Sequence, residues 1–132
     1  MILLSLIPFG ANQITLMLAA NYNITLDRAA DYSFVLVIKD ANNAAVNLTG
    51  DLFEGDIRLS SSKKQALEFS FANGGSSGQV TFTLTAAQTK QLIAGSNYEY
   101  DVFLIRSVGN GGKTIRLLEG TVTVRAQRTN DV

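Results

Sequence analysis

The chain has 132 residues, the length of one domain with a buried core of its own. Eleven basic and eleven acidic side chains give a formal net charge of zero, so the chain lacks the positive excess that attracts nucleic acid. It contains no cysteine and no histidine, which excludes disulfides, the usual zinc ligands, and catalysis that depends on either residue type.

The first twenty residues are apolar and almost uncharged. Residues 1–7 form a short apolar run that Pro8 ends, and no basic residue precedes it, so we expect neither a signal peptide nor a membrane span. Two interpretations remain open for this segment: it adds one or two strands to the fold, or it acts as an arm that pairs with a neighbouring subunit. The interaction residues that the second interpretation predicts are Ile2, Leu3, Leu4, Leu6, Ile14, Leu16 and Leu18.

Alternation of apolar and polar residues predicts strands through the next part of the chain. Residues 33–39 are apolar at both alternating sets of positions, which is typical of a central strand covered on both faces. Residues 40–43 have the composition of a turn. Residues 51–59 alternate between apolar and charged positions, which predicts a strand with one face in water.

A hairpin and a short helix are expected next. Residues 67–71 and 79–84 alternate cleanly and are joined by the glycine-rich segment 73–78, so we interpret them as two paired strands. Thr85 and Gln88 have the spacing of a helix capping box, and Gly95 supplies a stop. The expected helix covers about residues 86–94, with Leu92 and Ile93 as its buried anchors.

A second hairpin closes the chain. Residues 97–107 and 114–125 are predicted strands joined by a glycine-rich loop, and a change of apolar phase near residues 118–120 indicates a β-bulge. The complete pattern predicts an all-β fold, a single Ig-like antiparallel β-sandwich of about seven to nine strands with one short α-helix. We expect residues 1–20 to form the apolar N-terminal strand or arm, and residues 21–132 to form the sandwich domain.

Few side chains suggest chemistry. Glu99 and Asp101 should share one face of a strand, but Phe103 and Ile105 share it too, so we interpret the pair as solvated or salt-bridged rather than catalytic. Residues 40–43 and 109–112 are interpreted as turns rather than calcium or phosphate loops. We therefore predict no catalytic, cofactor-binding or metal-binding residue. A sugar-stacking platform stays open as an alternative, on the tyrosines Tyr22, Tyr32, Tyr98 and Tyr100.

Several short motifs occur in a recognisable order from residue 24 to residue 129. They are Ile24–Asp31, Asn47–Gly50, Leu84–Thr85 with Thr89 and Leu92, Tyr98–Asp101, and Gly120–Val124 with Thr129. In order and spacing this series resembles the small β-sandwich module of tailed-bacteriophage virion proteins, which include baseplate and tail-fibre attachment proteins. Two positions differ from the usual pattern: Asn47 stands where an aspartate is more typical, and Ala29 stands where a glycine is usual.

The resemblance implies a non-enzymatic structural protein of a phage virion, most simply a tail or baseplate component or a tail-fibre adaptor. It implies docking onto other virion proteins and a homo-oligomer within the virion. No nucleic acid, membrane or cofactor is expected as a partner. The alternative is a ligand-binding or carbohydrate-binding β-sandwich module of an adhesin.

Overall fold

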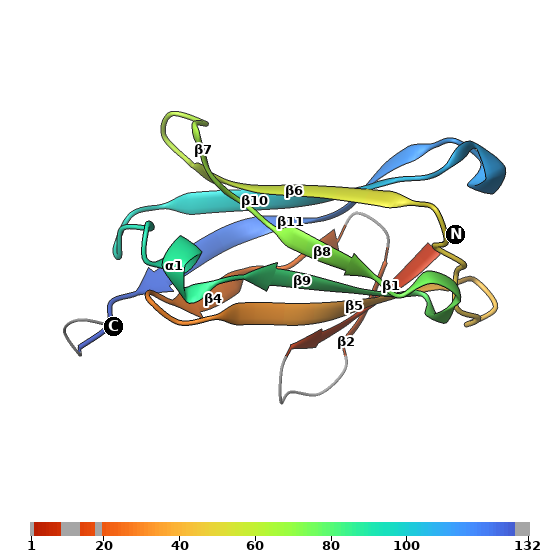
Figure 1. Ribbon diagram of the computed structural model, residues 1–132, viewed down its shortest axis with the longest axis horizontal. Coiled ribbons are helices and arrows are strands. Elements are labelled where there is room, and N and C mark those ends of the chain that lie inside the picture. Colours follow the sequence, from red (N-terminus) through yellow and green to blue (C-terminus); the bar gives the residue numbers. More distant parts are fainter. Residues whose placement is uncertain (1, 9–13, 18–19, 129–132) are drawn as a thin grey trace.

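The computed structural model describes residues 2–8, 14–17 and 20–128, which form a sandwich of two β-sheets (Figure 1). The predicted all-β sandwich is therefore confirmed. One sheet has the strand order β2-β1-β5-β9-β8 and contains β1 (Ile2–Pro8), β2 (Ile14–Met17), β5 (Tyr32–Asp40), β8 (Ser70–Asn73) and β9 (Gln79–Leu84). The other has the order β3-β11-β10-β6-β7, with β4 also on β11, and contains β3 (Ala20–Asn21), β4 (Ile24–Asp27), β6 (Leu52–Leu59), β7 (Gln65–Glu68), β10 (Tyr98–Ile105) and β11 (Thr114–Arg125). These eleven described strands exceed the expected number because several are pieces of two to four residues.

The central strand of the first sheet is β5, as its composition predicts. It lies between β1 and β9, and Phe34, Leu36 and Ile38 are buried on its inner face. Val37, at an alternate position, is also buried, with 6% of its surface exposed. Val35, on the same outer face as Val37, is only half-buried, so the central position of the strand is confirmed but the expected cover on both faces is only partial.

The segment 65–73 crosses from one sheet to the other, and here the sequence interpretation was right only for the second half of the segment, because β8 forms the expected hairpin with β9 whereas β7 does not. Residues 67–71 are not one strand of a hairpin, because β7 pairs with β6 of the second sheet and only β8 pairs with β9. Phe69 lies at the crossing, where its backbone N–H donates to the Gly55 carbonyl at 3.0 Å. Alternation predicts which side chains face inward, and that property is unchanged when a strand passes from one sheet to its neighbour.

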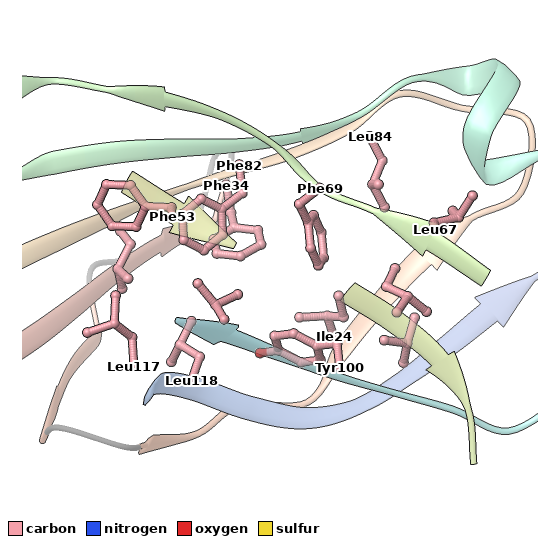
Figure 2. Packing of buried hydrophobic residues seen from close by; sticks show 14 of the residues in the cluster. Ile24, Phe34, Phe53, Leu67, Phe69, Phe82, Leu84, Tyr100, Leu117 and Leu118 are labelled. Atoms are coloured by element: carbon pink, nitrogen blue, oxygen red, sulfur yellow. The ribbon is translucent and has the colours of Figure 1, made fainter. Parts of the chain in front are cut away.

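Aromatic rings of both sheets meet at this crossing. The ring of Phe69 lies 6.1 Å from that of Phe82 in the first sheet and 6.1 Å from that of Tyr100 in the second (Figure 2). The Phe82 ring is also 4.6 Å from that of Phe34, in an edge-on arrangement that aromatic pairs favour. The crossing strand therefore joins the two layers through the centre of the core.

The hairpin of β10 and β11 contains the predicted bulge. Val102 pairs with Leu118 and Phe103 pairs with Arg116, so Leu117 is the extra residue. Leu117 and Leu118 are both fully buried although they are adjacent. An extra residue shifts the alternation by one position, which explains the change of apolar phase in the sequence.

Strand β4 departs from the expected antiparallel arrangement. It pairs in parallel with β11, from Ile24 opposite Val122 to Asp27 opposite Arg125, and β3 also pairs in parallel with β11. Strands this far apart in the chain are not joined by a tight turn, so nothing requires them to be antiparallel. The antiparallel expectation is therefore wrong for this edge of the second sheet.

The predicted helix begins where expected and ends early. Thr85 and Gln88 form the capping box, but helix α1 covers only Ala86–Thr89. Leu92 is 1% exposed and is a core anchor as predicted, whereas Ile93 is 64% exposed and is not. After Lys90 the helical i→i−4 bonds give way to shorter-range ones, from the Gln91 N–H to the Gln88 carbonyl at 3.0 Å and from the Leu92 N–H to the Thr89 carbonyl at 3.1 Å. The Ile93 N–H then donates to the Tyr98 hydroxyl at 2.9 Å.

Two glycines in open space give a test of the turn that follows the helix. A Cβ added at Gly95 or at Gly109 meets nothing within 4 Å, but Gly95 has a φ of +85° and Gly109 does not have a positive φ. We expect Gly95→Ala to lower the free energy of unfolding by about 1 kcal/mol, because a left-handed backbone is unfavourable for an L-residue. Gly109→Ala is the matched control and should change it by less than about 0.5 kcal/mol. Equal urea midpoints for the two variants would contradict the left-handed turn at Gly95.

The backbone of the N-terminal segment extends the first sheet. Strand β1 pairs with β5 from Ile2 opposite Asp40 to Pro8 opposite Phe34, and β2 pairs with β1. The predicted interaction residues Ile2, Leu3, Leu4, Leu6, Ile14 and Leu16 lie on these two strands, whereas Leu18 lies outside the described residues. The predicted role of these side chains stays a prediction. Among the described residues, no helix is long and apolar enough to cross a membrane.

Candidate functional site

Four carboxylates lie in a row across the second sheet, one on each of four neighbouring strands. The register places Glu68 of β7 opposite Asp56 of β6, Asp56 opposite Asp101 of β10, and Asp101 opposite Glu119 of β11. Side chains paired in this way share one face of a sheet. We call this set Glu68, Asp56, Asp101 and Glu119 the acidic row. Like charges placed directly opposite one another are unfavourable, so the row needs nearby donors.

The donors come from the same face of the sheet. Arg58 contacts Asp56 at 2.8 Å, and the Gln65 amide donates to Asp56 at 2.9 Å and to Glu68 at 3.0 Å. Arg116 contacts Glu119 at 3.1 Å and approaches Asp101 at 3.9 Å. Asp101 is thus the member of the row whose cationic neighbour is more distant than hydrogen-bond range.

Asp101 lies in a groove of about 380 Å³. Burial raises the pKa of its carboxyl group, and the Asp56 carboxylate raises it further, against the opposing effect of Arg116. Four carboxylates and two guanidinium groups line the groove, and Lys63 pairs with one of these carboxylates, that of Glu99, so these groups together carry a formal charge of −1. The groove therefore favours a positively charged group over a negative one.

An apolar corner adjoins the acidic row on the same face. It consists of Leu52, Phe103 and Ile105, of which Leu52 is 65% exposed and stands opposite Ile105 in the register. The guanidinium carbon of Arg116 lies 5.2 Å from the centre of the Phe103 ring, within the range of a cation–π contact. Exposed aliphatic and aromatic side chains beside an arginine are the combination found at protein interfaces.

At one end of the sandwich, the buried Asp51 side chain links two loops through hydrogen bonds. Its side chain has no exposed surface and accepts hydrogen bonds from Arg106 Nε at 3.0 Å, the Ser107 backbone N–H at 2.8 Å and the Asn110 amide at 3.0 Å. Burial alone would raise the pKa of Asp51, but these donors outweigh it and hold the pKa below its ordinary value. The β10–β11 loop is thereby fixed to the turn of residues 47–50.

The same turn is held from both sides. Arg106 also donates to the Asn47 carbonyl at 2.6 Å, and the Asn73 amide donates to the carbonyls of Leu48 and Asp51. The Asn47 side chain accepts from the Thr49 backbone N–H at 3.0 Å, a local turn that an aspartate could equally form. The loop end is therefore rigid, and it presents Val108, which is 93% exposed.

The charged residues selected from the sequence lie where that interpretation placed them. Glu99 and Asp101 share the outer face of β10, where Lys63 contacts Glu99 at 2.5 Å. In the segment 40–43, Asp40 accepts the backbone N–H groups of Asn42 and Ala44, so this segment is a turn. The segment 109–112 likewise belongs to a hairpin loop that begins with the 3-10 turn Val108–Asn110.

The four tyrosines do not gather into an exposed platform. Tyr98 and Tyr100 are core residues, with 3% and 4% of their surface exposed, and Tyr22 and Tyr32 are half-buried against the same core. The Tyr100 hydroxyl donates to the Tyr22 carbonyl at 2.6 Å, and burial raises the pKa of Tyr100 and of Tyr32. These rings contribute to packing, which leaves little aromatic surface for a sugar.

Sequence reasoning missed the acidic row, the apolar corner and the role of Asp51. Each depends on which residues of different strands stand opposite one another, and a single strand's pattern does not contain that register. Across the side chains that the structure describes, no group of three acidic residues converges in a way that could hold a metal ion. The arrangement is a broad charged face with an apolar corner, suited to contact with another macromolecule.

No model of a known protein family matches the chain, and no curated protein sequence is significantly similar to it.

Proposed function

We propose that the chain is a structural protein of a bacteriophage virion, a tail or baseplate component or a tail-fibre adaptor, which acts by docking onto other virion proteins and catalyses no reaction. The phage assignment comes from the resemblance of the ordered motifs between residues 24 and 129. The docking role is carried by one observation, the outer face of the second sheet, where the apolar corner and the acidic row are contiguous.

This face has the features of a contact surface rather than of a reaction site. Leu52, Phe103 and Ile105 offer apolar area, and Arg116 is already oriented by Phe103 and Glu119. The backbone beneath them is a sheet of paired strands, so little conformational entropy is lost when a partner binds. The groove beside them, whose charged groups sum to −1, favours a partner that brings a basic side chain.

The role predicts that the protein is present in purified particles of the phage that encodes it, and that Leu52 contributes to its attachment. We expect Leu52→Asp to lower the number of copies per particle at least tenfold, the effect of about 1.4 kcal/mol lost from one contact. Quantitative mass spectrometry of particles carrying each variant measures this number.

Thr81→Asp is the matched control, because Thr81 lies on the other sheet, where β9 pairs with β5. It should leave the copy number unchanged, and circular dichroism should show that both variants are folded. Absence of the wild-type protein from particles would contradict the virion role. Normal incorporation of Leu52→Asp would contradict docking through the apolar corner.

A further inference from the structure

Strand β2 forms one border of the first sheet. It pairs with β1 through four residues, from Ile14 opposite Leu6 to Met17 opposite Leu3, and the strand order places β2 at the end of the sheet. The other edge of β2 faces no described strand, so its outward N–H and C=O groups are available to a further strand. In Figure 1 β2 extends away from the body of the sandwich.

The other sheet edges carry features that oppose pairing with another chain. Strand β4 ends at Asp27, which pairs with Arg125, and β7 ends at Glu68 and follows Lys63 and Lys64. Strand β8 is uncharged, but both of its ends are held by other parts of the fold: the Phe69 N–H donates to the Gly55 carbonyl, and the Asn73 amide donates to the carbonyls of Leu48 and Asp51. Strand β3, at the remaining edge, has only two residues, and very short edge strands offer little to pair with. Charged residues and covered ends are the usual protection of edge strands.

Strand β2 has no such protection in its sequence. Residues 1–26 contain no Asp, Glu, Lys or Arg, and the first charged residue of the chain is Asp27. The only proline of the chain is Pro8, in β1, so every residue of β2 keeps its backbone N–H. An uncharged edge with a complete set of donors and acceptors is a template for strand addition.

We propose that β2 pairs antiparallel with β2 of a second copy of the chain across a two-fold axis. A second copy of the chain fits this edge best, for two reasons. An antiparallel strand presents donors and acceptors that match those of an identical strand turned around a two-fold axis. An uncharged strand also carries no charge pattern that would select a different partner. One such contact joins two five-stranded sheets and removes both free edges at once. The inference deepens the proposed structural role and rests on it, since virion components occur in several copies.

The absence of cysteine from the chain allows a direct test. Single cysteines are placed in turn at Ile14, Thr15, Leu16 and Met17 of the 132-residue chain, which is then mildly oxidised. In an antiparallel pair, residues opposite one another have Cα atoms about 4.5–5.5 Å apart, within the range that a disulfide spans. We expect one position, or two adjacent positions, to give at least ten times more disulfide-linked dimer than the others.

Ala72→Cys is the matched control, because Ala72 is an exposed residue of β8, at the opposite border of the same sheet. It should give only background crosslinking. The unmodified protein supplies a measurement that needs no variant: in sedimentation equilibrium its mass should rise with concentration from 14.2 kDa towards twice that value. Crosslinking of all four β2 variants at the level of Ala72→Cys, or a mass of 14.2 kDa at every concentration, would overturn the pairing.

The two proposals fail in different experiments. A protein that is incorporated into particles but is monomeric in solution would overturn the β2 pairing and leave the virion role intact. A protein that dimerises through β2 but is missing from particles would overturn the virion role and leave the β2 pairing intact.

Discussion

Replacing Asp51 with asparagine is expected to lower the free energy of unfolding by about 3 kcal/mol, the usual cost of removing one partner from a buried ion pair. The Asp51 side chain has no exposed surface, and the side chain of its partner Arg106 is only 16% exposed. Asparagine keeps the shape of the carboxylate but turns one acceptor into a donor. At least one of the three donors from Arg106, Ser107 and Asn110 then faces another donor inside the protein.

Asp56→Asn is the matched control for this prediction. Asp56 also pairs with an arginine, at 2.8 Å, but the side chains of Arg58 and Asp56 are 43% and 26% exposed, so water screens the pair. Removing that charge should change stability by less than about 1 kcal/mol. Urea denaturation of the two variants at neutral pH measures the difference, and equal losses would show that the Asp51 network contributes no more than a surface ion pair.

The Asp51 effect should also depend on pH. The pKa of Asp51 is lower in the folded protein than in the unfolded chain. In the unfolded chain an aspartate has a pKa of about 3.9. The stabilising contribution is therefore fully present above that value and is lost as the pH falls through the folded pKa. The difference in stability between wild type and Asp51→Asn should shrink below about pH 4, which thermal unfolding measured from pH 7 to pH 2.5 can follow.

The parts of the fold that the sequence predicts are those determined by neighbouring residues. Residues 33–39 are apolar at both sets of positions and identified a central strand, whereas residues 51–59 alternate and identified a half-exposed one. Both predictions follow from the fact that side-chain direction repeats every two residues. The capping box of Thr85 and Gln88 was predicted for the same reason, since both of its hydrogen bonds join residues three apart. The bulge at Leu117 left a shift of phase that could be detected within one strand.

The resemblance motifs also have local physical explanations. Ala29, where the pattern has a glycine, has a φ of +66°, so the position requires the left-handed backbone that glycine adopts most easily. Gly50 has a φ of +84° and ends the turn that Asn47 begins. Residues such as these determine turns and packing, so their order supports a shared fold more strongly than it supports a particular partner.

The remaining features depend on contacts between distant residues. The strand that crosses between sheets at Phe69 keeps the alternation of a single strand, and the parallel pairing of β4 with β11 joins residues 98 positions apart. The acidic row needs the register of four strands before it becomes visible. In each case the contacts that set the local structure involve residues elsewhere in the chain, so the local sequence does not reveal them.

Among the glycines that the structure describes, Gly120 is expected to tolerate substitution least. A Cβ at this position would lie 2.2 Å from the carbonyl oxygen of Tyr22 and 2.7 Å from its carbonyl carbon, far inside van der Waals contact. The residues between β3 and β4 run alongside β11 here, in the same parallel register as the two strands, and are held on it by two hydrogen bonds. These bonds run from the Tyr22 N–H to the Glu119 carbonyl at 2.8 Å and from the Thr121 N–H to the Asn23 side chain at 3.0 Å. Because the atoms in contact are backbone, a side-chain rotation cannot relieve the overlap.

Gly120→Ala should therefore lower the free energy of unfolding by about 3 kcal/mol, at the upper end of the usual cost of overpacking. We expect the structural change to be concentrated at Tyr22 and in the adjoining strand β4. The Tyr100 hydroxyl should lose its hydrogen bond to the Tyr22 carbonyl, which is 2.6 Å long. The amides of β4, which pairs with residues 122–125, should exchange hydrogen faster. Gly109→Ala provides the control, since a Cβ there meets nothing and its backbone needs no positive φ. Hydrogen exchange followed by mass spectrometry separates the two variants. A Gly120→Ala protein with wild-type stability and wild-type exchange in β4 would mean that the Tyr22 backbone does not approach Gly120 this closely.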